Sequence, residues 1–130
     1  MTLKLVAITF LVKDYGEAIA WFCDVLDFAL IENTDMGAGK RWVVVESKNS
    51  VRLLLAKADG AKQTDQIGRA AGGRVAFFLN TDNFQQDHAR MILAGVQFKE
   101  TPRHEPYGTV AVFEDLYGNL WDLIEPTKKP

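Results

Sequence analysis

The chain has 130 residues, of which 48% are hydrophobic and 25% charged, and its formal net charge is −2. This length accommodates one compact domain or two small fused modules. The weak negative charge excludes a basic field for nucleic acid or a membrane surface, and no apolar run reaches the roughly 18 residues of a membrane span. A single cysteine, Cys23, excludes an intrachain disulfide framework, and the N-terminus lacks a signal-peptide pattern, so we expect a cytoplasmic protein.

The first part of the chain is predicted to contain a strand, a helix and three further strands. An apolar, β-branched run over 3–12 predicts a strand buried on both faces. Asp14 is suited to cap a helix over 15–26, in which apolar residues recur at helical spacing. The remaining strands are predicted over 28–31, 41–46 and 51–56, with turns over 36–39 and 48–50.

The second part repeats this order after residues 58–72, which are rich in Ala, Gly, Gln and Asp and are predicted to be a linker with a short helical turn over 65–69. The repeat indicates an internal duplication, with a first module over 1–57 and a second over 73–130. The alternative is an ordinary α+β domain with two helices. Strands are predicted over 74–79, 96–100, 109–114 and 120–125, a loop over 102–108, and a helix over 84–94 capped by Thr81-Asp82.

Two segments carry a resemblance to a known family. Ile8-Thr9-Phe10-Leu11-Val12-Lys13-Asp14 with Trp21–Phe28, and Gly108–Ile124 with its Asp115-Leu116-Tyr117-Gly118-Asn119, are similar to the opening and closing segments of the vicinal oxygen chelate superfamily. This superfamily includes glyoxalase I, extradiol dioxygenases and bleomycin-resistance proteins. Asp27 and Leu116 replace the usual Gly and Pro. The resemblance implies an α+β fold in which tandem βαβββ modules form a curved mixed-sheet cup.

The resemblance also implies four metal-ligand positions, one on each of four strands. Here they hold Ala7, a strand over 51–56 without His or carboxylate, Arg74 (or Val75 if the register slips by one residue), and Asp122. Divalent metals need converging imidazole or carboxylate ligands, so we expect neither a metal nor another cofactor.

Asp122 would lie between aliphatic neighbours on its strand, and a buried charge needs a partner. We therefore predict an Arg74–Asp122 ion pair where the metal would have been. Two interpretations of this pair remain open, a structural ion pair and a ligand-binding group.

The other candidate ligand-binding residues each have a structural alternative. Thr9 would be either a core hydroxyl or a contact in the cup, and of Arg41 and Trp42 only one side chain can face inward. Trp42 would stack on a flat ligand or belong to the core. His104 and Tyr107 would touch a ligand at the cavity mouth or lie in a surface loop.

These features favour a metal-independent protein that sequesters or senses a small organic ligand, and a homodimer is expected because short modules leave sheet edges to cover. The alternative is a glyoxalase-like lyase or isomerase, or an extradiol dioxygenase-like metalloenzyme. A structural or partner-binding domain is a third class, but it leaves the apolar cup unexplained.

Overall fold

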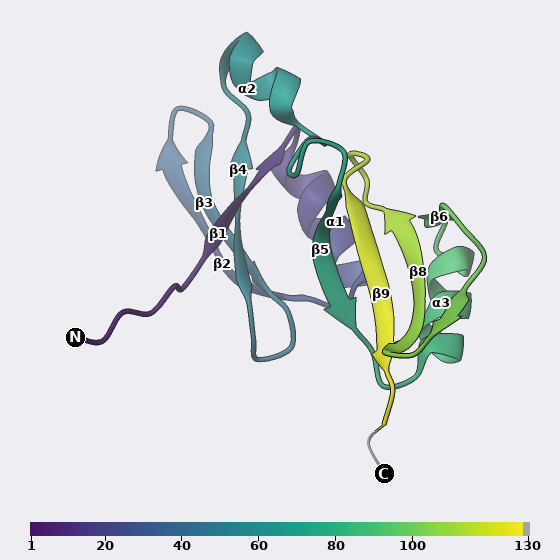
Figure 1. The fold of residues 1–130 in the computed structure, drawn as a ribbon. Helices are drawn as coiled ribbons and strands as arrows, with labels where there is room; N and C mark the ends of the chain where they lie inside the picture. The colour runs from purple at the N-terminus through teal and green to yellow at the C-terminus, as the bar shows by residue number, and fades with distance from the viewer. Residues whose placement is uncertain (129–130) are drawn as a thin grey trace. The chain divides into compact units, whose positions relative to one another are not determined.

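The computed structural model describes residues 1–128, and the chain divides into two compact units, of which the first ends at Ile67 and the second starts at Gly68 (Figure 1). The first unit contains a four-stranded mixed sheet and the second a five-stranded one. This confirms the predicted α+β fold, with a strand, a helix and further strands in each part. Within residues 1–128 no helix is long and apolar enough to cross a membrane.

The first unit places one helix against one face of its sheet. Its strands lie in the order β1-β4-β3-β2, with β1 and β4 parallel and the other neighbours antiparallel. Helix α1 packs against β2, β3 and β4, and we call the face of this sheet that points away from α1 the open face. The elements are β1 (Ile8–Val12), α1 (Tyr15–Val25), β2 (Ala29–Gly37), β3 (Lys40–Glu46) and β4 (Arg52–Lys57).

Helix α1 begins where the sequence predicts it. The Asp14 side chain accepts a hydrogen bond from the backbone N–H of Glu17 at 2.8 Å, which satisfies one of the free N–H groups of the first turn. Ala18 and Phe22 follow one helical turn apart and are fully buried. The ring of Phe22 meets that of Phe10 on β1 edge to face, with centroids 5.1 Å apart. This aromatic contact fixes the helix against the sheet.

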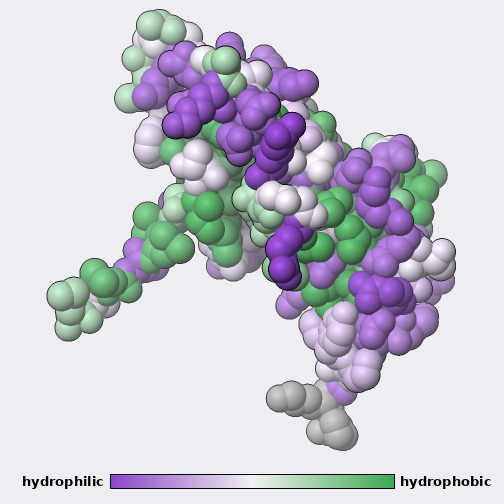
Figure 2. All heavy atoms as spheres, turned by 45° about the horizontal axis from the view of Figure 1, so that its top comes forward, coloured by the Kyte–Doolittle hydropathy of each residue, from purple (hydrophilic) through white to green (hydrophobic). Residues whose placement is uncertain are grey.

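The predicted strand over 3–12 is wrong for its first residues, because only Ile8–Val12 is paired. β1 has β4 as its partner, and the ladder begins with Ile8 opposite Leu53. Residues 1–7 form an arm outside the strands, in which Leu3 is 85% exposed. In Figure 2 this arm extends away from its unit, with most of its atoms coloured as hydrophobic.

Strand β2 is longer than the prediction of 28–31, because it continues to Gly37. All nine of its residues are exposed. The residues of Glu32–Asp35 are all polar, so this stretch lacks the alternation of apolar and polar residues that would reveal a strand. Antiparallel pairing with β3 holds it instead, with a register shift between Leu30 and Glu32. The turn to β3 consists of Ala38 and Gly39.

The second unit is built on β8 and β9, which pair along their full lengths. The sheet order is β5-β9-β8-β6, with β7 also paired to β8, and β5 and β9 are parallel. The predicted loop over 102–108 thus contains a short strand that sequence reading missed. The elements are β5 (Val75–Asn80), α3 (Phe84–Leu93), β6 (Gln97–Phe98), β7 (Arg103–Glu105), β8 (Gly108–Glu114) and β9 (Leu120–Pro126).

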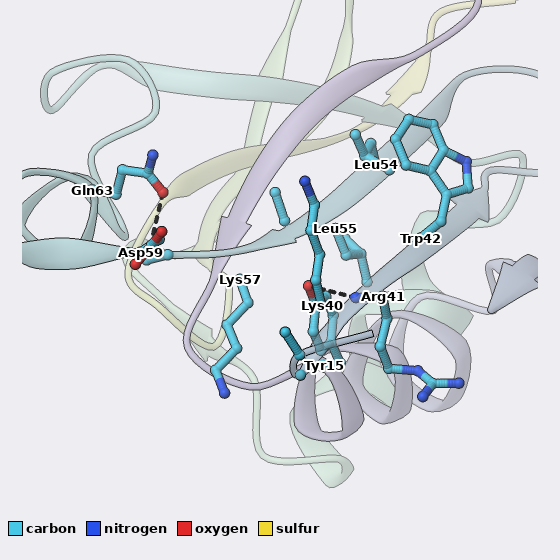
Figure 3. A pocket seen from close by; sticks show the side chains of 13 residues that line it. Tyr15, Lys40, Arg41, Trp42, Leu54, Leu55, Lys57, Asp59 and Gln63 are labelled. Atoms are coloured by element: carbon cyan, nitrogen blue, oxygen red, sulfur yellow. Dashed lines mark hydrogen bonds between the residues drawn. The ribbon is translucent and has the colours of Figure 1, made fainter. Parts of the chain in front are cut away.

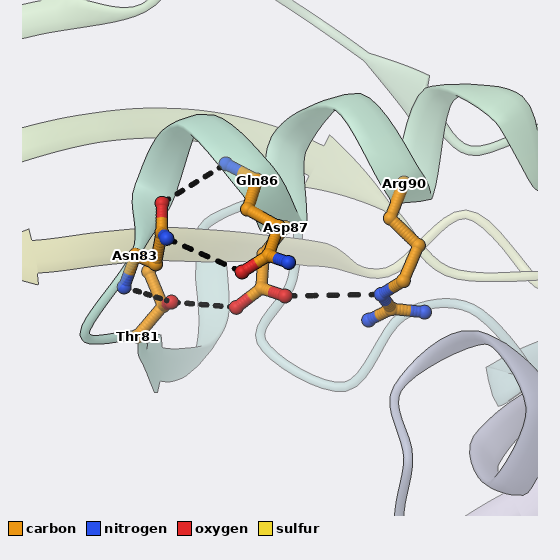
Figure 4. Close-up of polar contacts among 5 residues, drawn as sticks. All are labelled: Thr81, Asn83, Gln86, Asp87 and Arg90. Atoms are coloured by element: carbon orange, nitrogen blue, oxygen red, sulfur yellow. Dashed lines mark hydrogen bonds and ion pairs between the residues drawn. The ribbon is translucent and has the colours of Figure 1, made fainter.

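Helix α3 is capped one residue later than predicted. The N-cap is Asn83 rather than Thr81-Asp82, and its side chain accepts a hydrogen bond from a backbone N–H three residues on (Figure 4). The Thr81 hydroxyl accepts from the Asn83 N–H at 3.0 Å and donates to the Asp87 carboxylate at 2.6 Å. Thr81 therefore supports the cap, and Asp82 stays exposed.

The closing segment that resembles the superfamily motif forms a buried hydrogen-bond network in the turn between β8 and β9. The buried Asp115 carboxylate accepts from the backbone N–H groups of Tyr117 and Asn119, from the Asn119 amide and from the Trp121 indole, all at 2.9–3.0 Å. The side-chain amide oxygen of Asn119 also accepts from the Ala70 N–H at 2.9 Å. The polar side chains of these motif residues are therefore used in hydrogen bonds that stabilise the fold.

The predicted linker over 58–72 contains the short helix α2 (Gly60–Gln66). The expected helical turn over 65–69 coincides with this helix only at Asp65 and Gln66, because α2 starts five residues earlier and ends at Gln66. The boundary between the two units, Ile67/Gly68, also falls inside this segment.

Candidate functional site

The first unit has a cavity of about 540 Å³ at the end of the sheet where β3 begins and β4 ends (Figure 3). We call it the Trp42 pocket. Its walls come from the β2–β3 turn, from β3 and β4, and from the segment that leads into α2. The lining residues are Tyr15, Ala38, Gly39, Lys40, Arg41, Trp42, Leu54, Leu55, Ala56, Lys57, Ala58, Asp59 and Gln63.

The apolar wall of this pocket is made by Trp42 and Leu54, whose side chains lie next to each other in Figure 3. Trp42 lies on the same side of β3 as Val44, which is paired with Leu54 on β4. The Trp42 side chain is 42% exposed, so the interpretation of Trp42 as a core residue is wrong. A half-exposed indole on an open sheet face can stack on a flat ligand.

Arg41 projects on the other side of β3, in agreement with the expectation that only one of the two residues faces inward (Figure 3). Its backbone N–H donates to the Tyr15 hydroxyl at 3.1 Å, and its guanidinium Nε donates to the Asn33 side-chain oxygen at 2.7 Å. Tyr15 begins α1, so this bond ties the pocket edge to the helix.

Thr9 lies opposite Leu54 in the β1–β4 ladder, on the open face but outside the set of lining residues. Its side chain is exposed, which contradicts the interpretation as a core hydroxyl. A contact with a ligand on the open face stays a prediction.

The second unit contains a separate group of charged side chains, Glu100, Arg103, Glu105 and Asp122, which we call the Asp122 cluster. The Arg103 guanidinium contacts the carboxylates of Glu100 at 2.8 Å and Glu105 at 3.1 Å. Hydrogen bonds to Glu100 and Tyr107 raise the pKa of Arg103, and that to Arg103 lowers the pKa of Glu100.

Asp122 is the member of this cluster that has an unsatisfied carboxylate oxygen among the described residues. Its Oδ1 atom is buried and has no hydrogen-bond partner within residues 1–128. Burial raises the pKa of the Asp122 carboxyl, an effect that the charge of Arg103 opposes and that of Glu100 reinforces. On either side in the sheet lie Val112 and Phe78, and Phe78 is 68% exposed. An exposed ring thus adjoins a carboxyl group with unused hydrogen-bonding capacity.

The predicted Arg74–Asp122 ion pair is wrong. Arg74 precedes β5, is exposed, and within residues 1–128 forms no ion pair with Asp122. The ladder shows the reason, because Phe78 is the β5 residue opposite Asp122, four positions beyond Arg74. Arg103 is the arginine whose charge acts on Asp122.

The two loop candidates lie around β7. His104 is on β7 itself, exposed, with its Nδ1 atom 3.2 Å from the Thr109 hydroxyl oxygen. Tyr107 is exposed in the turn between β7 and β8, and its side chain interacts with Arg103. Of the two, only Tyr107 thereby adjoins the Asp122 cluster.

Several site residues were missed by sequence reading, namely Tyr15, Lys40, Lys57 and Asp59 in the Trp42 pocket and Arg103 in the second unit. The residues of the first group could have been found from the sequence, because each lies at or near the beginning or end of a predicted strand or helix, and these positions meet at one end of the sheet. For Arg103, the alternating charges at 100, 103 and 105 were the available signal.

The residue types at the four metal positions do not fit a divalent ion. Ala7 and strand β4 offer no ligand atom, and Arg74 is a cation, which leaves Asp122 alone. Within residues 1–128 no group of three His, Cys, Asp or Glu side chains gathers in a way that could hold a metal. Cys23 is half-buried on α1, and burial together with the carboxylates of Asp24 and Asp27 raises the pKa of its thiol, which disfavours the reactive thiolate.

Comparison with known proteins identifies relatives that align with nearly the whole chain. A protein of Shewanella frigidimarina (strain NCIMB 400) is 52% identical over 99% of this chain and 98% of its own. The crystal structure of UcmS2 is 29% identical with a TM-score of 0.81, covering 96% of this chain and 99% of that one. TnmS3, an antibiotic binding protein from Streptomyces sp. CB03234, is 24% identical with a TM-score of 0.75 over 98% and 99% of the two chains.

The family model for the Glyoxalase/Bleomycin resistance protein/Dioxygenase superfamily matches residues 4–123, nearly the whole chain. The match spans both units and includes the α1 cap at Asp14 and the Asp115 network described above. The chain therefore belongs to the Glyoxalase/Bleomycin resistance protein/Dioxygenase superfamily.

Proposed function

We propose that this chain is a metal-independent small-molecule-binding protein that sequesters or senses an organic ligand. The observation that carries the proposal is the Trp42 pocket, which has a volume of about 540 Å³ and a half-exposed indole beside an aliphatic side chain. Pockets for small organic ligands in proteins have volumes of about 300–1,000 Å³ and mix apolar walls with a few polar groups.

The residue types at the family's metal positions support the metal-independent part of the proposal. Glyoxalase and extradiol dioxygenase chemistry relies on a metal as Lewis acid or oxygen activator, and Ala7 and Arg74 stand at two of the ligand positions. Such an enzyme is the competing function. TnmS3, described as an antibiotic binding protein, has the same fold and lends support to a binding role.

A homodimer and a cytoplasmic location belong to the proposal as well. β1 and β2 are the two edge strands of the first sheet, and unpaired strand edges favour pairing with another chain. Light scattering after size-exclusion chromatography measures the oligomeric state directly.

The test uses the three indole N–H signals of the ¹⁵N-labelled protein in two-dimensional NMR. Trp42 is half-exposed at the pocket, whereas the Trp121 indole N–H is buried and bonded to Asp115. A panel of flat organic fragments, such as naphthalene, quinoline and flavone derivatives, is titrated into the protein. We expect at least one fragment to shift the Trp42 signal saturably and to leave the Trp121 signal in place. Trp42→Phe assigns the signal.

The metal content of the dialysed protein is measured in parallel by mass spectrometry, after incubation with nickel, zinc, manganese and ferrous ions. About one tightly held ion per chain would overturn the metal-independent function and favour the enzyme. A Trp42 signal that no fragment moves would overturn ligand binding at this pocket.

A further inference from the structure

The charge around the Trp42 pocket is opposite in sign to that of the chain. The ionisable side chains other than Tyr15 that line the pocket are three cations, Lys40, Arg41 and Lys57, and one carboxylate, Asp59. The chain as a whole has a net charge of −2. The positive charge is therefore a local property of this pocket.

Carboxylates within the described residues do not form ion pairs with these cations, although Asp35 lies opposite Arg41 in the β2–β3 ladder. Within residues 1–128 none of the three forms an ion pair; the first unit's arginine–glutamate pair joins Arg52 to Glu46, which lie outside the pocket. The Arg41 guanidinium is bonded to the Asn33 amide, a neutral partner that leaves its charge intact. Unpaired cations around one cavity raise the local potential and favour an anionic ligand.

Their geometry distinguishes one cation from the other two. Lys40 lies two residues before Trp42 on β3, so both side chains project from the same side of the strand. Figure 3 shows the Lys40 ammonium on the side of Trp42 and Leu54, whereas Arg41 and Lys57 project away from them. A ligand against the Trp42 ring would thus meet Lys40 directly and the other two cations only through their longer-range field.

We propose that the Trp42 pocket takes an organic anion, with a flat apolar ring system against Trp42 and a carboxylate, sulfonate or phosphate group beside Lys40. This inference rests on the proposed function, because it names the chemical class of ligand for the same pocket. The opposite preference has a physical basis too, since an indole face attracts cations and Asp59 lies at the rim. The experiment must therefore compare ligands that share one ring system and differ in the charge of its substituent.

The probes are 2-naphthoate, 2-naphthamide and 2-naphthylmethylammonium, which share a ring system and differ in charge. Their dissociation constants are measured from the Trp42 indole NMR signal. Opposite unit charges about 4 Å apart in water change an affinity by about fivefold, so we expect 2-naphthoate to bind at least about fivefold more tightly than 2-naphthamide. This preference shrinks in 1 M salt, where the Debye length falls to about 3 Å.

Three lysine variants show which side chain supplies the positive charge that favours 2-naphthoate. Lys40→Gln removes most of the preference for 2-naphthoate, and Lys57→Gln removes less of it because that side chain points away. Lys48→Gln, in the turn between β3 and β4 and outside the pocket, is the matched control and keeps the preference. An unchanged Trp121 signal in each variant shows that the second unit is intact, and unchanged far-ultraviolet circular dichroism shows the same for the whole chain.

The outcomes separate this inference from the function on which it rests. If 2-naphthamide or the ammonium probe shifts Trp42 with equal or higher affinity than 2-naphthoate, the organic ligand stands and the anion is refuted. A preference for 2-naphthoate that survives Lys40→Gln also overturns the inference. If none of the three probes reaches Trp42, the anion inference falls, and the wider fragment panel decides the function by itself.

Discussion

Replacement of Asp115 by alanine tests whether the family's closing motif acts through the fold. The carboxylate accepts four hydrogen bonds, and three of the donors belong to buried residues, namely the backbone N–H and side-chain amide of Asn119 and the indole N–H of Trp121. A buried donor left without a partner costs about 1–3 kcal/mol. Asp115→Ala should therefore lower the free energy of unfolding by about 3–9 kcal/mol, a large part of the roughly 5–15 kcal/mol typical of a domain.

The assay is urea unfolding followed by circular dichroism and by tryptophan fluorescence. Asp115→Asn keeps one carbonyl acceptor, so its free energy of unfolding should fall by less than that of Asp115→Ala. Asp82→Ala is the matched control, because Asp82 is exposed and the α3 cap is Asn83; a surface substitution of this kind changes stability by about 0.5 kcal/mol or less. A loss for Asp115→Ala as small as that of the control would refute the reasoning.

Three further changes test other parts of the chain in the same unfolding assay. Asp27 follows α1 with a φ of 59°, so Asp27→Gly should stabilise by about 0.5–1 kcal/mol; Asp24→Gly, inside α1, should destabilise, and equal effects of the two would contradict the argument. Gly68 has a φ of 81°, and a Cβ there would meet the Tyr117 carbonyl oxygen, so Gly68→Ala should cost about 1 kcal/mol or more; a neutral result would show that the backbone relaxes. Burial raises the pKa of Asp122 in the folded state, so its contribution is most favourable in acid and is lost as pH rises from the ordinary value through the raised one. Asp122→Asn should therefore be more favourable for stability at pH 7 than at pH 4, and a difference from the parent protein that does not vary with pH would count against an elevated pKa.

The fold was predictable because its determinants are local in the sequence. Asp14 caps α1 through a residue three positions away, and Asp115 organises a turn within six residues of itself. Buried strands such as β8 and β9 also have apolar residues in the pattern expected of them. Strand β2 was predicted only in part, because its fully exposed residues depend on pairing with β3 and leave no apolar pattern.

The candidate sites were less predictable because they depend on register. The prediction of Arg74 as the partner of Asp122 used family positions, but the β5–β9 ladder places Phe78 opposite Asp122. The arginine that does act on Asp122 comes from β7, a strand hidden in a Pro-flanked loop. Sequence spacing gives the face of a strand on which a side chain lies, but not which residue of the neighbouring strand it meets.

The same distinction explains why the family motif is a poor guide to the ligand. The carboxylate of Asp115 and the side chain of Asn119 are already bonded within the fold, so neither is available to a ligand. The groups that are available, Trp42 and Lys40, lie in a stretch of β3 that carries none of the family's recognised residues. Proteins can therefore share the motif and the fold while binding different molecules, because selection for ligand acts on strand residues that the motif does not constrain. The probe series with matched charges addresses those residues directly.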